Sequence, residues 1–405
     1  MPSTHLSLTG HSRAIAIGSS FLFFIGNYLS GWPLLRYWNV SGGVFPDSED
    51  ILLMGECFGE RGLEIYSTAQ VDDCHGYWYG SMLVRALDFF RIGSELNIVV
   101  GFLFFLLLSY SLVTVVWSSV TLEKYRVYVL VGFLLSPPVL LLAHRGNFDS
   151  LIILLIIGSI FQIQRGNLFF ANTLIISSAF LKFYTAPLLL LTLLMSDRPR
   201  KFFLLLVADL ATAIVLLGDL SRVTHFWNGD SFKQMFGLGA LTGAVNETMT
   251  FQISGSLAKN LDLGLLIFAL LCLGLTRRRW RIALPEEFQG NFKLLGFLLF
   301  GSVSVVSFML GSVDYRLIFL VFSILFLISI YEFAVGEIFF LSFLSIFAVM
   351  LSFPSGKMNI YGDAAALTIN AIILFFLVPL LLNLARLFFS RVRIYLQNLS
   401  SKVTS

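Results

Sequence analysis

Apolar runs that can fill a lipid bilayer recur along the whole 405-residue chain, and they limit its possible folds more than any other feature. Hydrophobic residues make up 57% of the sequence and charged residues 13%, whereas soluble domains carry about 25% charged residues. A water-soluble fold cannot cover so much apolar surface, but a bilayer solvates it. Because a chain inside lipid must satisfy its own backbone hydrogen bonds, the sequence predicts an all-α polytopic membrane protein.

The charged residues between the apolar runs divide them into about twelve predicted transmembrane helices, within a single transmembrane domain over residues 1–405. The first run has no convincing signal-peptide cleavage site after it, so it is expected to remain as a span. The predicted spans are Ala14–Leu29, Ile98–Val120, Tyr128–Ala143, Leu151–Ile163, Leu168–Leu181, Pro187–Met195, Phe202–Gly218, Leu263–Thr276, Leu294–Leu310, Leu317–Ile330, Ile338–Leu351 and Leu367–Leu384.

Lysine and arginine residues in the short connections predict the orientation. The strongest basic clusters, at 197–201, 277–281 and 386–393, are separated by even numbers of predicted spans, so they lie on one side. The positive-inside rule makes that side, and both termini, cytoplasmic in a cell's inner (plasma) membrane. Two long hydrophilic loops, 30–96 and 219–262, are then extracytoplasmic.

Charge and composition exclude several classes of partner. The net charge is only +3 and the basic residues form short clusters, so no nucleic-acid partner is predicted. No phosphate-cradling glycine loop is present, so the energy for any reaction must arrive with the substrate. The histidines are not spaced with other ligands as in zinc sites. No metal or other cofactor is therefore predicted, although a divalent ion at first-loop carboxylates stays open.

Two of the three cysteines, Cys57 and Cys74, share the first long loop. If that loop faces an oxidising compartment, the two thiols are candidates for a disulfide. Two unrelated thiols fit the sequence equally well, because spacing alone does not fix the distance between their Cα atoms.

Polar residues beside the hydrocarbon region are the main candidates for function, because they are costly there without a partner or a cavity. The first group is the run from Asp47 to Asp50, in the loop that follows the first predicted span. Its carboxylates can act as a general base on a hydroxyl or hold a metal. A solvated acidic turn is the simpler interpretation of the same run.

The second group is the run from His144 to Asp149, between the third and fourth predicted spans. His144 and Arg145 together suit a phosphate at a membrane boundary. Asn147 and Asp149 suit turn or cap positions. The alternative is therefore a structural turn in which Asp149 caps the next helix and pairs with Arg145.

Two further cations complete the candidates. Lys182 lies in the otherwise uncharged run 168–194, which favours a partner or ligand over snorkelling to the interface. Arg316, at the start of the tenth predicted span, either pairs with Asp314 or serves an anion site beside Tyr315. All four groups fall on the predicted extracytoplasmic side.

The order and spacing of these groups resemble a known family. The matching residues are Asp50, Glu56, Cys57, Gly62, Tyr66 and Cys74 in the first loop, followed by the runs 144–149, 181–187 and 314–316. With them the chain resembles membrane glycosyltransferases of the GT-C fold, family 87 in particular. The likeness extends from about residue 47 to residue 320.

The resemblance implies an inverting glycosyltransferase that moves a hexosyl or pentosyl group from a polyprenyl-phosphate donor. The acceptor would be a hydroxyl of a lipid or a cell-envelope polysaccharide, on the extracytoplasmic face of the bilayer. It implies Asp50 as the general base, with Asp47 as second choice. Cations would stabilise the leaving phosphate. The implied phosphate ligands are His144, Arg145, Lys182 and Arg316, supported by Asn147, Asp149, Asp314 and Tyr315.

Two other functions stay open from the sequence. A secondary transporter would also have about twelve spans, but it should show two related halves and charges near the bilayer midplane. A non-catalytic membrane subunit of polysaccharide assembly is the second alternative. It is favoured by the segment 76–80, which reads Gly-Tyr-Trp-Tyr-Gly where the family has a Tyr-Pro-Pro-like element. Either protein should tolerate Asn at position 50.

Overall fold

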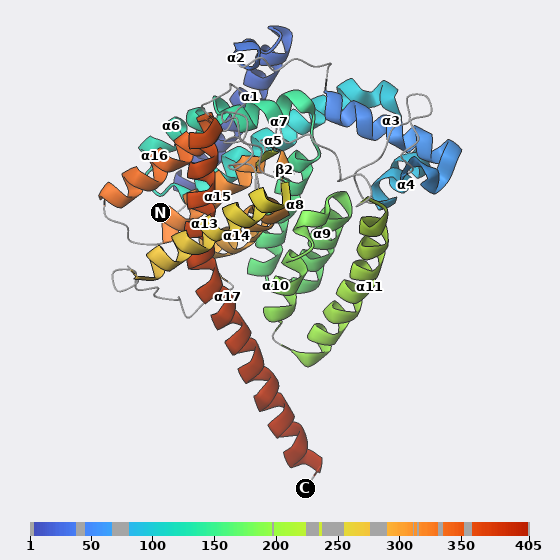
Figure 1. Cartoon of the computed structure of the whole chain (residues 1–405), viewed down its shortest axis with the longest axis vertical. Coiled ribbons are helices and arrows are strands. Elements are labelled where there is room, and N and C mark those ends of the chain that lie inside the picture. Colours follow the sequence, from blue (N-terminus) through green and yellow to red (C-terminus); the bar gives the residue numbers. More distant parts are fainter. Residues whose placement is uncertain are drawn as a thin grey trace.

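The computed structural model of the chain describes residues 4–37, 45–66, 81–196, 198–223, 235–236, 255–275, 290–310, 312–313, 316–330, 335–351 and 359–403. Helices make up nearly all of these ranges (Figure 1). The helices before the second long loop are α1 (Thr4–Leu29), α2 (Pro33–Tyr37), α3 (Pro46–Arg61), η1 (Gly62–Tyr66), α4 (Ser81–Phe90), η2 (Ser94–Leu96), α5 (Asn97–Ser119), α6 (Glu123–Leu134), α7 (Pro137–Arg145), α8 (Asp149–Gln164), α9 (Leu168–Leu181), η3 (Phe183–Thr185), α10 (Leu188–Leu194) and α11 (Pro199–Val223).

The rest of the described chain is built in the same way. Its helices are α13 (Gly255–Leu275), α14 (Phe292–Leu310), α15 (Leu317–Ile330), α16 (Val335–Leu351) and α17 (Asn359–Val403). The short strands β1 (Met235–Phe236) and β2 (Ser312–Val313) pair antiparallel, which joins the second long loop to the end of α14. The predicted all-α class is confirmed for the described residues, apart from this two-residue pair.

Several helices are long and apolar enough to cross a membrane. Among the described residues, four stretches meet this condition: Ser94–Ser119, Pro199–Asp219, Phe292–Met309 and Tyr361–Ile394. A fifth candidate is the pair α6 and α7, which is bent by 58°. Pro137 and Pro138 begin α7, and a proline there removes backbone donors and ends the preceding helix. These helices support a membrane protein.

Every predicted span coincides with a helical segment, but several of the helices are short. The predicted bounds Leu168–Leu181 and Leu317–Ile330 match α9 and α15 to the residue. In contrast, α10 has 7 residues. At about 1.5 Å per residue it covers roughly a third of a ~30 Å hydrocarbon core. The count of twelve spans therefore stays a prediction.

The first long loop, 30–96, is largely helical where it is described. The helix expected over Ile51–Gly59 lies inside the longer α3. It packs along α4 at Gly55, where a Cβ would lie 2.8 Å from Cβ of Leu87, so only glycine fits without a shift. The Oε1 atom of Glu56 accepts hydrogen bonds from the backbone N–H and the hydroxyl of Ser94. The α3–α4 pair is thereby fixed beside the start of α5.

A distant carboxylate fixes the start of α4. Asp219, near the end of α11, accepts hydrogen bonds from the backbone N–H of Ser81 at 2.7 Å and from its hydroxyl at 3.0 Å. Carboxylates are good partners for the unpaired N–H groups at a helix N-terminus. This contact joins the two long loops, because α4 belongs to the first and Asp219 begins the second. Most of the second loop lies outside the described residues.

Several of the largest fully buried side chains are phenylalanines at the contact of α14 and α15. The ring of Phe300 stacks on Phe326 at 5.8 Å and on Phe319 at 6.3 Å. All three are buried. Aromatic burial of this size provides much of the packing energy that holds these helices together. The start of α15, which Arg316 directly precedes, is thus fixed to the rest of the bundle.

Candidate functional site

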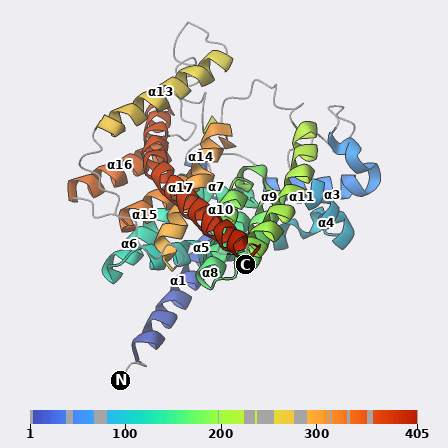
Figure 2. The same cartoon turned by 90° about the horizontal axis from the view of Figure 1, so that it is seen from below.

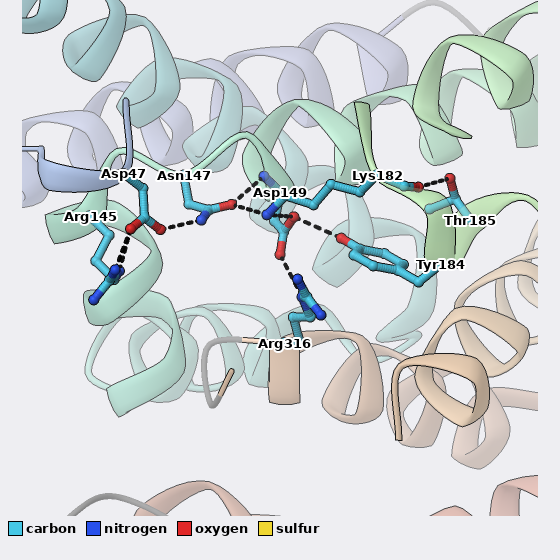
Figure 3. Close-up of polar contacts among 8 residues, drawn as sticks. All are labelled: Asp47, Arg145, Asn147, Asp149, Lys182, Tyr184, Thr185 and Arg316. Atoms are coloured by element: carbon cyan, nitrogen blue, oxygen red, sulfur yellow. Dashed lines mark hydrogen bonds and ion pairs between the residues drawn. The ribbon is translucent and has the colours of Figure 1, made fainter. Parts of the chain in front are cut away.

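Four segments that are far apart in the sequence meet at one end of the helices. They are the start of α3, the α7–α8 connection, the α9–η3 connection and the residue before α15 (Figure 3). The side chains drawn there form one row of polar contacts that begins at Arg145 and Asp47 and ends at Tyr184 and Arg316. The four groups singled out in the sequence therefore converge in space.

The α7–α8 connection is a tight turn that depends on Gly146. Its φ of 58° lies in the left-handed region, which favours glycine. An added Cβ would lie 2.8 Å from Oγ of Ser48 and 2.9 Å from Cβ of Phe45, so the start of α3 presses directly on the turn. The Oδ1 atom of Asn147 accepts the backbone N–H of Asp149, the first residue of α8, at 2.9 Å.

The first half of the row joins Asp47 to this turn. The Nε atom of Arg145 donates to Oδ1 of Asp47 at 2.7 Å, and a second arginine nitrogen forms an ion pair with the same oxygen. The amide of Asn147 donates to Oδ2 of Asp47. Arg145 therefore pairs with Asp47, and the expectation that it would pair with Asp149 is wrong. The expectation that Asp149 would cap α8 is also wrong, because Phe148 occupies the cap position and Asp149 is the first residue of the helix.

The second half is centred on Asp149, which is fully buried. Its Oδ1 atom lies 2.6 Å from Nζ of Lys182 and accepts a hydrogen bond from the Tyr184 hydroxyl at 2.7 Å. The Nε atom of Arg316 lies 3.5 Å from the other oxygen, Oδ2. The guanidinium of Arg316 also lies over the ring of Tyr184, 4.6 Å from its centroid.

One hydrogen bond connects the two halves. Nζ of Lys182 donates to Oδ1 of Asn147 at 2.7 Å, while the amide of Asn147 donates to Asp47. Lys182 therefore has Asp149 and Asn147 as partners, and snorkelling to the interface is not its role. Figure 3 shows Arg145 and Arg316 on the same side of the row.

Cations and carboxylates alternate in the row. Among the described residues it holds three cations, Arg145, Lys182 and Arg316, and two carboxylates, Asp47 and Asp149. Lys182 and Asp149 are 2% and 0% exposed, whereas the side chains of Arg145 and Arg316 are 31% and 16% exposed. An anion can therefore reach the two arginines at the rim, while the buried Lys182 adds positive charge beneath them.

The remaining predicted residues lie around or outside this row. Asp50 is exposed on α3, one turn beyond Asp47. His144 is buried with its ring edge-on to Trp32 at 5.4 Å, and its Nδ1 atom has no hydrogen-bond partner among the described residues. Asp314 and Tyr315 lie outside the described residues. The predicted phosphate role of His144 is therefore not supported by a contact to the row.

The cysteine prediction is resolved only in part. Cys57 is disulfide-bonded and buried on α3, while Cys74 lies outside the described residues. Among the described residues, no group of three or more His, Cys, Asp or Glu side chains is placed to hold a metal ion.

Sequence reasoning missed Tyr184 and Thr185 as parts of the site. Tyr184 contacts both Asp149 and Arg316, and the Thr185 hydroxyl donates to the backbone carbonyl of Lys182 at 3.1 Å. The available signal was their position in the same short break between apolar runs as Lys182. The Thr185 hydroxyl bonds a backbone carbonyl at the break in the helix, whereas the Tyr184 hydroxyl bonds the carboxylate of Asp149 on α8. Comparison of this chain with known protein families, curated proteins and solved structures finds no match.

Proposed function

We propose that this chain is an inverting membrane glycosyltransferase that takes a sugar from a polyprenyl-phosphate donor. In this proposal it has a GT-C-like arrangement with about twelve spans and cytoplasmic termini, in the plasma membrane. The row from Arg145 to Arg316 faces the extracytoplasmic side and receives the donor phosphate. The acceptor is a hydroxyl of a glycan or lipid.

The observation that supports this proposal is the placement of the carboxylate of Asp47 in one row with three cations, Arg145, Lys182 and Arg316. Asp47 is joined through Asn147 to Lys182, so the candidate base and the phosphate site belong to one rigid assembly. Transfer from a lipid phosphate needs both, because a proton must leave the acceptor while negative charge develops on the departing phosphate.

The reaction assigns different roles to the two halves of the row. A carboxylate oxygen takes the proton of the acceptor hydroxyl, whose oxygen then bonds to the anomeric carbon of the donor. The bond from that carbon to the phosphate oxygen breaks, and its electron pair leaves with the phosphate. Arg145 and Arg316, the more exposed cations, contact the phosphate, while Lys182 adds positive charge from below.

Asp47 is the better placed of the two predicted bases. It is 6% exposed and lies in the row, whereas Asp50 is exposed on α3. Two nitrogens of Arg145 contact Oδ1 of Asp47, whereas Oδ2 accepts only from the amide of Asn147 and keeps a second lone pair for a substrate hydroxyl. We therefore assign the base to Asp47, in place of the residue that the sequence favoured.

The two carboxylates provide a matched pair of variants. Purified protein is tested for transfer of radiolabelled sugar from a panel of polyprenyl-phosphate donors, beside Asp47→Asn and Asp50→Asn. Turnover by the unchanged protein that falls at least about a hundredfold in Asp47→Asn but not in Asp50→Asn supports the proposal. Loss of turnover in Asp50→Asn but not in Asp47→Asn would support the same reaction with Asp50 as the general base. No turnover from any donor would contradict the function.

A measurement of donor binding distinguishes a variant that has lost catalysis from one that no longer folds. Asp47→Asn should still bind the donor, because Arg145 and Arg316 are unchanged. A transporter or a non-catalytic subunit would show no sugar transfer in either the unchanged protein or the variants. Uptake of a labelled solute into proteoliposomes would then favour the transporter.

A further inference from the structure

One carboxyl group that the polar row does not use lies inside the bundle. Asp209 is on α11, within the apolar stretch Pro199–Asp219 and ten residues from each of its ends. At about 1.5 Å per residue, it lies roughly 15 Å from either end and therefore near the middle of a ~30 Å hydrocarbon core. An acidic side chain is costly at this depth, so its surroundings decide what it does there.

The neighbours of Asp209 come from the two helices that α11 packs against, α9 and α10. The three helices lie beside one another in both views of the molecule (Figure 1 and Figure 2). The amide of Asn172 on α9 donates to Oδ1 of Asp209 at 2.7 Å. The hydroxyl of Thr192 on α10 contacts the side-chain oxygen of Asn172 at 2.5 Å, which orients the amide toward Asp209.

The second oxygen of Asp209 has no such neighbour. Its Oδ2 atom is buried without a hydrogen-bond partner among the described residues, and the whole residue is 7% exposed. An ionised carboxylate away from water needs donors or a cation at its oxygens. Oδ2 is therefore the atom at which this group can bind a positively charged ligand.

No basic side chain on the adjoining helices neutralises Asp209. The sequences of α9 and α10 contain no ionisable residue. On α11, the nearest charged residues are Lys201 and Asp219, eight and ten residues away, or about 12 and 15 Å along the helix. A carboxyl group in an apolar interior without a cation becomes neutral by taking a proton. A proton needs only the one free oxygen, whereas a metal ion needs several ligands.

We propose that Asp209 is a proton-binding site in the middle of the membrane, held in place by Asn172 and Thr192. The proton binds at Oδ2, while Oδ1 keeps the hydrogen bond from Asn172. Release of the proton leaves a negative charge at the contact of three helices, as in the carboxylate relays of proton pumps and transporters.

This site is separate from the polar row. Asn172 lies ten residues before Lys182 in the sequence, or about 15 Å along α9. The proposal therefore holds whether or not the chain transfers a sugar.

Dicyclohexylcarbodiimide tests the proposal, because this apolar reagent modifies carboxyl groups that carry a proton. The purified protein in micelles is labelled over a range of pH, and peptide mass spectrometry measures the labelled fraction at each carboxyl. Asp47 is the matched control within the same molecule. It is 6% exposed, close to the 7% of Asp209, but it pairs with Arg145 and is held ionised.

We expect Asp209 to be labelled at least about tenfold faster than Asp47 at neutral pH, and its labelling to fall as the pH is raised. Asn172→Leu should stay labelled to a higher pH, because it removes the donor that stabilises the ionised carboxylate. Asp209→Asn should lose the label at this position.

Three outcomes would overturn the proposal. They are equal labelling of Asp209 and Asp47, labelling of Asp209 that does not change with pH, and protection of Asp209 by Na⁺ but not by choline. The last of these would assign the site to a metal ion. Because the two carboxyl groups are compared in the unchanged protein, the result does not depend on whether a variant folds.

Discussion

Nζ of Lys182 donates to the side-chain oxygen of Asn147 at 2.7 Å, and the amide of the same asparagine donates to Asp47. Asn147 is fully buried and accepts the backbone N–H of Asp149 as well. A single neutral side chain therefore orients two charged residues from distant segments and bonds the first backbone N–H of α8. The short amide of asparagine provides both donors and an acceptor, which these three contacts need.

Replacing Asn147 with Asp should destabilise the protein, because it places a second carboxylate against Asp47 and removes the donor between them. We expect a loss of about 2–4 kcal/mol, measured as a lowered unfolding temperature in detergent. The exchange variant Asp47→Asn with Asn147→Asp restores one donor and one carboxylate and should recover part of the loss. A single variant as stable as the unchanged protein would contradict the arrangement.

Replacing Lys182 with Met should cost about 3–5 kcal/mol, because it removes the closest cation from a fully buried Asp149. Lys201→Met is the matched control, since its side chain is partly exposed, and it should change stability by less than about 0.5 kcal/mol. Thermal unfolding of the two variants in the same detergent measures the difference. Similar small losses in both would show that Asp149 does not need Lys182.

A second polar cluster lies inside the bundle and predicts a separate effect. The amide of Asn172 on α9 donates to Oδ1 of Asp209 on α11 at 2.7 Å, and its oxygen accepts from Thr192 on α10 at 2.5 Å. The other oxygen of Asp209 is buried with no partner among the described residues. Asn172→Leu should therefore destabilise the protein by about 1–3 kcal/mol, since it leaves Asp209 without its donor.

The double variant Asn172→Leu with Asp209→Leu tests the reason for that effect. It removes both polar groups and should be more stable than Asn172→Leu alone. Chemical unfolding of both variants in micelles measures the coupling. If the stability that the double variant loses equals the sum of the losses caused by Asn172→Leu and Asp209→Leu separately, the two side chains do not interact.

Cys57 should react with a maleimide only after reduction, because it is disulfide-bonded in a buried position on α3. Alkylation in native membranes, with and without a membrane-permeant reductant, checks this, and mass spectrometry identifies the bonded partner. Cys57→Ser and Cys74→Ser should then expose one new thiol each if they are the pair. Free reactivity of Cys57 in untreated membranes would contradict the bond.

Much of the helical content could be predicted from local sequence. Apolar runs such as Leu168–Leu181 and Leu317–Ile330 define α9 and α15, because charged or turn-forming residues mark both ends. The bend before α7 was missed, since Tyr128–Ala143 was predicted as one span although Pro137 and Pro138 lie within it. The extent of α17 was missed, since its C-terminal half mixes arginines with apolar residues and no longer reads as a span.

The choice between Asp47 and Asp50 could not be made from the sequence. The two residues are three apart and therefore lie on neighbouring faces of α3, so periodicity does not separate them. The turn at Gly146 decides which one is buried, because it brings Arg145 and Asn147 against the start of the helix. The pairing of Arg145 depends on the same contact.

The sequence by itself determined that this chain is an apolar, helical membrane protein, and it identified the four polar segments that form the row. Both conclusions follow from local composition and from the cost of placing polar groups in lipid. Only the tertiary structure decided the pairing of charges: Arg145 with Asp47, Lys182 with Asp149 and Asn147, and Arg316 with Asp149 and Tyr184. These partners are tens to hundreds of residues apart, and their proximity depends on how helices pack rather than on any local pattern.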